Sequence, residues 1–95
     1  MTTVLVNHRV ADYDSWRPEF DGAMEAEWTN GIRSYQVLRG QDDPNHVLVV
    51  QTFESREAAE ELVNNPALRE AMGRAGVDPS SVQIDYLDEV ASGTR

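Results

Sequence analysis

The sequence contains no cysteine and no lysine. Without cysteine, the chain can form neither a disulfide nor a zinc–thiolate centre, and it has no thiol nucleophile. Without lysine, no side chain can form a Schiff base, since all eight basic residues are arginines. No apolar run approaches the roughly 20 residues of a membrane helix, and no basic segment with an apolar stretch follows Met1. We therefore expect a cytoplasmic protein without a membrane partner.

Positive charge is also scarce. Seventeen acidic residues against eight arginines give a formal net charge of −9. Because nucleic acids and anionic membranes attract basic surfaces, neither is an expected partner. The two histidines, His8 and His46, fall on different predicted elements, whereas metal sites need clustered ligands. The sequence also shows no glycine-rich phosphate loop, so we expect neither a metal nor an organic cofactor.

The segment His46–Phe53 determines the predicted architecture. A strand with one solvated face alternates apolar with polar side chains, but residues 47–50 read Val-Leu-Val-Val. If this segment is a strand, both of its faces are covered. A chain of 95 residues is one small domain, and its helices suffice for one face of a sheet. We therefore expect a second copy of the chain to cover the other face.

Three more strands are predicted from alternation at every second residue, over Val4–Val10, Ile32–Arg39 and Val82–Val90. The residues between 40 and 45 favour turns, so the second strand and His46–Phe53 form a hairpin. We predict one domain over residues 1–90 and a flexible C-terminal tail over residues 91–95.

Helices are predicted from apolar residues at steps of three and four. The first runs over Tyr13–Trp28 and either starts near Ser15 or is kinked at Pro18. Ser55 caps the second, which Pro66 interrupts before a further turn or two. The order β-α-β-β-α-β predicts an α+β, ferredoxin-like fold, with a four-stranded antiparallel sheet and its helices on one face. Two such sheets stacked through their bare faces form an α/β barrel around a two-fold axis.

Four segments carry a resemblance to a known group of proteins: Val6–Trp16, Val37–Gly40, Asp43–Asn45 and Asn65–Met72. Together they resemble the dimeric α/β-barrel superfamily over roughly residues 3 to 90. That group includes antibiotic-biosynthesis monooxygenase-like domains, small polyketide cyclases, stress-responsive barrels and haem-degrading monooxygenases. The resemblance implies a homodimer with a pocket between the helices and the sheet of each subunit. It does not select one reaction, because the fold hosts unrelated activities.

Two activities implied by the resemblance can be compared with the residues present. Haem-degrading members resemble this chain in a first-strand asparagine, which Asn7 matches, but they need an axial histidine on the later helical segment. Residues 55 to 76 contain no histidine, so haem is not expected. Cofactor-free members oxidise phenolic or anthrone-type aromatics in a pocket with asparagine, tryptophan, tyrosine and arginine side chains. The residue types of this chain are similar to theirs.

His8 is the candidate catalytic residue. It interrupts a strand face that is otherwise formed by Val4, Val6 and Val10, and histidine gives and takes protons near neutral pH. It could act as a general base or as a polar anchor for an aromatic ligand. The alternative is a structural histidine that is hydrogen-bonded to a neighbour. His46 is interpreted as a surface turn residue.

Five residues are candidates for substrate binding. Three of them, Trp16, Phe20 and Trp28, would pack against the substrate, while Asn7 and Tyr35 would offer hydrogen bonds. An apolar stripe at helical spacing is more often an ordinary core. The combined hypothesis is a small homodimeric enzyme, cofactor-independent and monooxygenase-like or cyclase-like, acting on a hydrophobic or aromatic small molecule. The alternative is a non-catalytic ligand-binding or stress-responsive dimeric barrel.

Overall fold

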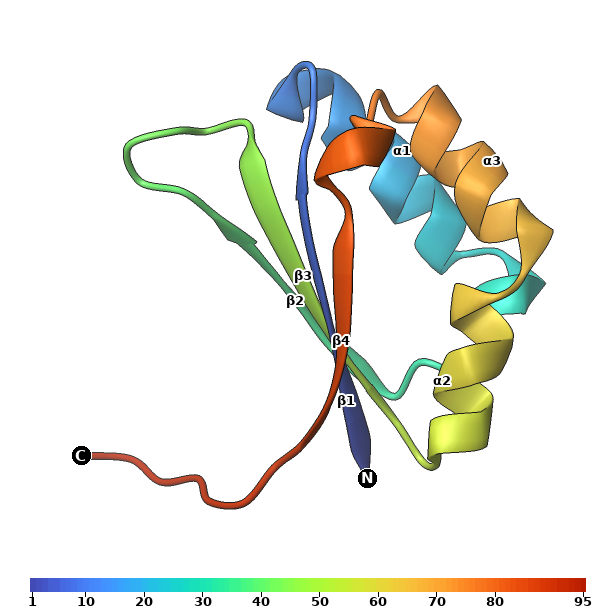
Figure 1. Ribbon diagram of the computed structural model, residues 1–95, viewed down its shortest axis with the longest axis vertical. Helices are drawn as coiled ribbons and strands as arrows, with labels where there is room; N and C mark the ends of the chain where they lie inside the picture. Colours follow the sequence, from blue (N-terminus) through green and yellow to red (C-terminus); the bar gives the residue numbers. More distant parts are fainter.

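The computed structural model describes residues 1–95, and its sheet has four antiparallel strands in the order β2-β3-β1-β4. All the helices lie on one side of this sheet (Figure 1). The predicted ferredoxin-like α+β fold is thereby confirmed. The elements are β1 (Thr2–Arg9), α1 (Tyr13–Met24), η1 (Glu27–Thr29), β2 (Ser34–Arg39), β3 (His46–Phe53), α2 (Arg56–Val63), α3 (Pro66–Arg74), η2 (Pro79–Ser81) and β4 (Gln83–Asp88), where η denotes a 3-10 turn.

The strands β1 and β3 form the centre of the sheet. Their register places Val6 opposite Val49 and His8 opposite Val47, so these four side chains share the helix-covered face. Burial along β3 alternates residue by residue: the buried side chains belong to Val47, Val49, Gln51 and Phe53, and the partly exposed ones to His46, Leu48, Val50 and Thr52. Within a single chain, only one face of this strand is covered.

The opposite face of the sheet is open and has an apolar centre. Strand alternation and the pairing registers place five aliphatic side chains on it: Leu5, Leu38, Leu48, Val50 and Leu87. Two of them, on the outer strands, are strongly exposed: Leu38 at 49% and Leu87 at 44%. The outer strands are also shorter than predicted, since β2 begins at Ser34 and β4 ends at Asp88.

Helix α1 is shorter than predicted and ends before Trp28. Pro18 lies in its interior, where it removes one backbone hydrogen bond on an exposed side of the helix. The helical run stops because Ala26 has an extended backbone. The Thr29 hydroxyl then donates a shared hydrogen bond to the carbonyl oxygens of Ala23, at 2.9 Å, and Ala26, at 2.8 Å. A 3-10 turn, and not α1, therefore carries Trp28, which still packs on the core.

Two side-chain caps divide the second helical segment. The Ser55 hydroxyl oxygen accepts a hydrogen bond from the backbone N–H of Ala58 at the start of α2. The Asn65 side-chain carbonyl accepts one from the backbone N–H of Ala67 at the start of α3. Pro66 occupies the first position of α3, where its missing N–H has no helical partner to lose. The predicted interruption is confirmed. None of the helices combines the length with the apolar character that crossing a membrane requires.

Candidate functional site

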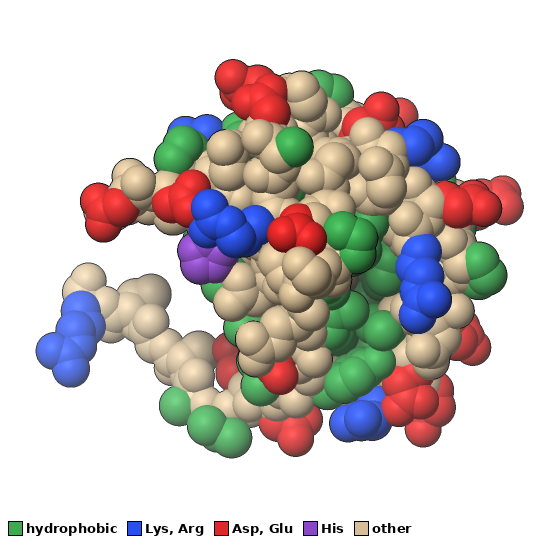
Figure 2. All heavy atoms as spheres, turned by 45° about the horizontal axis from the view of Figure 1, so that its top comes forward, with side chains coloured by type: hydrophobic (Ala, Val, Ile, Leu, Met, Phe, Trp, Pro, Cys, Tyr) green, Lys and Arg blue, Asp and Glu red, His purple; other side chains and the backbone are tan.

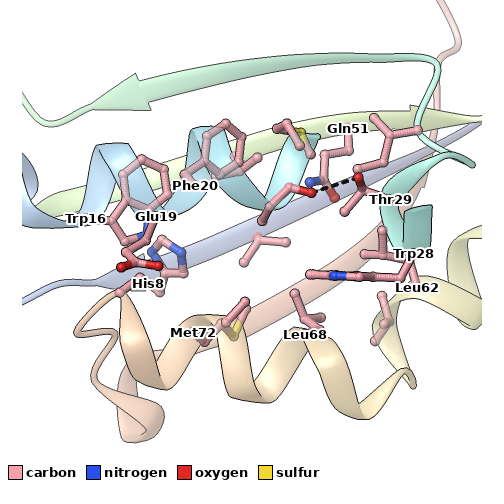
Figure 3. A pocket seen from close by; sticks show the side chains of 18 residues that line it. His8, Trp16, Glu19, Phe20, Trp28, Thr29, Gln51, Leu62, Leu68 and Met72 are labelled. Carbon is pink, nitrogen blue, oxygen red and sulfur yellow. Dashed lines mark hydrogen bonds between the residues drawn. The ribbon is translucent and has the colours of Figure 1, made fainter. Parts of the chain in front are cut away.

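A cavity of about 70 Å³ lies between the helices and the sheet. Fourteen of its eighteen lining residues are hydrophobic, and the four polar ones are His8, Glu19, Thr29 and Gln51. In Figure 3, β1 and β3 run behind the cavity, with α1 on one side and α3 on the other. Figure 2 shows hydrophobic side chains gathered in a hollow on the helix-bearing side of the molecule. The helix–sheet interface is thus incompletely filled by the chain itself.

His8 lines this cavity from the inner face of β1. Its side chain is almost completely buried, with 3% of the residue exposed, and its Nδ1 has no hydrogen-bond partner. Its ring lies edge-on to that of Trp16, with 5.9 Å between the ring centroids. Burial lowers the pKa of His8, because the cavity disfavours the charged ring; the backbone oxygens of His8 and Val47 partly offset this shift, and the nearby His46 lowers the pKa a little. The lowered pKa favours the neutral form of the ring.

The aromatic residues of α1 form one wall of the cavity. The rings of Trp16 and Phe20 are stacked, with centroids 4.9 Å apart and planes 19° apart. Offset stacking of this kind is a favourable arrangement for aromatic rings. Trp28 lies further along the cavity, beside Leu62 (Figure 3). Flat apolar surfaces thus line both ends of the space.

Two of the predicted substrate-binding residues lie outside the cavity. Asn7 is on the opposite face of the sheet, where its side-chain carbonyl accepts a hydrogen bond of 2.8 Å from Nε2 of His46. Strand alternation already separates it from His8, so the two residues cannot contact one ligand in the same pocket. Tyr35 shares the helix-covered side, but it does not line the cavity and is 47% exposed. It contacts the outer edge of Phe20, with 5.5 Å between ring centroids.

Three polar cavity residues, Glu19, Thr29 and Gln51, were not anticipated from the sequence. The Gln51 side chain is buried, with 7% exposed, and its Oε1 has no hydrogen-bond partner. Thr29 also faces the cavity, but its hydroxyl is satisfied by α1. The signal for Gln51 was available: it is the one polar residue among the alternate positions that include Val47, Val49 and Phe53. A polar residue at an inward strand position is a candidate for ligand contact.

The rim of the cavity carries charge, while its interior has none. Glu19 lines it from α1 and lies 3.8 Å from the guanidinium of Arg74 at the end of α3. This exposed ion pair joins the two helices and contributes little to stability by itself. No group of three or more histidine, cysteine or acidic side chains is arranged to hold a metal ion. The chemistry available inside the cavity is that of the His8 imidazole, the Gln51 amide and the indole N–H groups of Trp16 and Trp28 in an apolar, aromatic surrounding.

The cavity is small for a binding site. Small-molecule sites usually enclose roughly 300–1,000 Å³, so a fused-ring ligand needs the walls to move outward. The cavity contains adaptable side chains for this, since Met24 on α1 and Met72 on α3 both line it. Methionine is unbranched and repacks readily around different shapes.

The sequence matches the family model described as antibiotic biosynthesis monooxygenase, over residues 12–74. The matched segment extends from the start of α1 to the end of α3, and so includes most of the cavity walls. No curated protein matches the sequence.

Solved structures share the fold over almost the whole chain. A crystal structure of an antibiotic biosynthesis monooxygenase has a TM-score of 0.73 at 15% identity, covering 96% of this chain and 100% of that one. A variant of SnoaB, a cofactor-independent oxygenase from Streptomyces nogalater, has a TM-score of 0.74 at 14% identity, covering 96% and 94%. Rv0793 from Mycobacterium tuberculosis has a TM-score of 0.66 at 18% identity, covering 99% and 100%. At these identities the likeness establishes the fold alone.

Proposed function

The chain belongs to the antibiotic biosynthesis monooxygenase family, and from this premise we propose that it is a cofactor-independent, monooxygenase-like enzyme acting on a hydrophobic aromatic small molecule. The observation that carries the proposal is the state of His8. A buried, neutral base with an unpaired ring nitrogen lines an apolar cavity. Buried polar atoms are normally hydrogen-bonded, so an unpaired one on a residue that lines a cavity is suited to bind a ligand for which the walls move outward. The fold shared with SnoaB, a cofactor-independent oxygenase, supports the same reading.

His8 acts as the general base in this proposal. It takes a proton from a phenolic hydroxyl, or from the activated ring CH₂ of an anthrone-type substrate. The resulting anion is electron-rich and reduces dioxygen directly. Conversion of the CH₂ group to a carbonyl consumes one O₂ and releases one water, so the substrate itself supplies all the electrons. Trp16 and Phe20 hold the aromatic rings and keep water away from the anion. A cyclase-like reaction would use the same proton abstraction without dioxygen.

We also propose that the protein is a homodimer that stacks through the open face of the sheet. Leu48 and Val50 lie at the centre of that face, and the exposed Leu38 extends the apolar surface to the edge. Monomeric proteins rarely expose large contiguous apolar patches. A second copy placed face to face would remove these side chains from water and close the barrel. The cavity lies on the other side of the sheet, so each subunit keeps its own site.

A second candidate function is supported by the size of the cavity. At about 70 Å³ it is smaller than most enzyme pockets. This favours a non-catalytic barrel that binds a small apolar ligand, or none. The two candidates differ in whether His8 affects the rate of a reaction.

The test compares the two histidines. Anthrone serves as the probe, and oxygen uptake together with anthraquinone absorbance is the measurement. We expect His8→Ala to lower the rate by about 100-fold or more, the usual contribution of a general base. His46→Ala is the matched control, because that ring lies on the opposite face and should leave the rate unchanged. If anthrone binds but no oxygen is consumed, the monooxygenase-like proposal is wrong.

A further inference from the structure

A second unpaired polar atom faces the same cavity as His8. Gln51 lies on the inner face of β3 and is only 7% exposed, and its Oε1 has no hydrogen-bond partner. An amide oxygen left unsatisfied in the interior destabilises the fold by about 1–3 kcal/mol. These two are the buried side-chain atoms that lack a partner, and both belong to residues that line the cavity. The polarity of the cavity is therefore concentrated at two points.

The side chains of His8 and Gln51 lie at different positions along the face of the sheet that borders the cavity. Gln51 is opposite Val4 in the β1–β3 register, whereas His8 is opposite Val47. His8 lies four positions after Val4 on β1, which corresponds to about 13 Å along the strand at roughly 3.3 Å per residue. In Figure 3, His8 and Gln51 point into the cavity from separate positions along the sheet. One compact polar group cannot reach both atoms, but an elongated flat ligand can.

We infer that Gln51 is a specificity-determining residue, which hydrogen-bonds to a polar group at the far end of the ligand. The inference rests on the proposed function and adds to it a residue that selects among aromatic ligands. The ligand has one polar group beside His8 and a hydroxyl at the opposite end. A hydroxyl suits the second position, because it can donate to the unpaired Gln51 carbonyl oxygen and accept from the NH2 group of the same amide. Aromatics that lack this hydroxyl leave the oxygen unpaired and bind more weakly.

The surroundings of Gln51 agree with a role in ligand contact. Thr29, a polar cavity residue that could donate, already directs its hydroxyl to the carbonyl oxygens of Ala23 and Ala26. On the neighbouring strand, Tyr35 is opposite Gln51 but points its ring toward Phe20. Neither hydroxyl is therefore directed at the Gln51 oxygen. If Gln51 served only the fold, an apolar residue of similar volume would serve better at this position.

The experiment measures the binding of two probes by calorimetry: 2-hydroxyanthracene, with a hydroxyl at one end, and 2,6-dihydroxyanthracene, with hydroxyls at both ends. The wild-type protein should bind the second probe roughly tenfold more tightly, the usual value of one well-placed hydrogen bond. In Gln51→Leu this preference should disappear, while the affinity for the one-hydroxyl probe stays within about twofold. The Tm of Gln51→Leu should equal or exceed that of the wild type, since an unsatisfied buried amide has been removed. Gln51→Met repeats the test with an unbranched side chain.

Each other outcome decides against the inference. If both probes bind the wild type equally, Gln51 is satisfied by an ordered water and selects nothing. If both leucine and methionine variants unfold, the amide is structural. The His8→Ala variant separates this result from the proposed function: when it weakens the one-hydroxyl probe while Gln51 shows no selectivity, the site stands and only the inference on Gln51 falls. If neither probe binds the wild type, both proposals fail.

Discussion

The two faces of the sheet carry one histidine each, and the two residues are in opposite states. On the helix-covered face, His8 is buried, its Nδ1 is unpaired, and burial lowers its pKa. On the open face, His46 is half-buried and donates a hydrogen bond to Asn7. The same strand pair thus presents a satisfied histidine on one side and an unsatisfied one on the other. The difference lies in their neighbours, because His46 has the Asn7 amide beside it, whereas no hydrogen-bond partner reaches Nδ1 of His8.

The prediction with the largest expected effect compares two neighbouring residues of β3 whose side chains lie on opposite faces of the sheet. Val49 is buried at 3% exposure under the helices, while Val50 lies on the open face. An aspartate at position 49 places an unpaired carboxylate in the core, and Val49→Asp should lower the free energy of unfolding by about 3–5 kcal/mol. Val50→Asp is the matched comparison and should leave a folded chain, although it weakens the proposed dimer. Urea unfolding at a protein concentration where the wild type is monomeric, followed by circular dichroism, measures both; equal losses in the monomer would show that the faces do not differ.

The second effect concerns the open face alone. Leu48→Arg places one positive charge per subunit at the centre of the proposed interface, and like charges brought together oppose association. The dissociation constant of the dimer should rise about 100-fold, while the far-ultraviolet circular dichroism is unchanged. Sedimentation velocity across micromolar concentrations measures this. A wild-type chain that sediments as a monomer throughout would remove the dimer from the proposal.

The third effect is a pH dependence that belongs to the helix-covered face. Because the pKa of His8 is lowered in the folded state, the unfolded chain binds a proton first as the pH falls. The contribution of His8 to stability is therefore complete above about pH 6.5, the ordinary histidine pKa, and is lost as the pH falls below it. The free energy of unfolding should decrease between pH 7 and 5.5 in the wild type and in His46→Ala. The decrease should be smaller in His8→Phe. If the pH dependence of the free energy of unfolding disappears in His46→Ala instead, it arises from the histidine on the open face.

The smallest expected effect tests whether Asn7 belongs to the site. Asn7→Ala removes the hydrogen bond to His46 and should destabilise the fold by about 0.5–1.5 kcal/mol. Its binding of 2-hydroxyanthracene should match that of the wild type, because Asn7 lies on the face away from the cavity. Calorimetry at one pH measures this. Weakened binding would mean that the asparagine acts on the pocket through the sheet.

Part of the candidate site follows from one-dimensional patterns. The step-two alternation of β1 places His8 among inward valines, and the step-four spacing of α1 brings Trp16 beside Phe20. The resemblance to a family added Asn7, although alternation had already placed that residue on the other face. Gln51 was overlooked because the apolar run of residues 47–50 hides the alternation that continues through it. Where two rules conflicted, the local geometric one was correct.

The sequence by itself predicted the succession of strands and helices along the chain, the cap at Ser55, the interruption at Pro66, and which residues of a strand share a face; which face the helices cover came from the structure. These features depend on a few neighbouring residues, which is why patterns of two and 3.6 residues report them. Tertiary structure alone decided that Trp28 leaves α1 on a 3-10 turn, that the helices pack incompletely over the sheet, and that the atoms left unpaired there belong to His8 and Gln51. Packing volume and hydrogen-bond partners arise from contacts between segments far apart in the chain, and no local pattern encodes them.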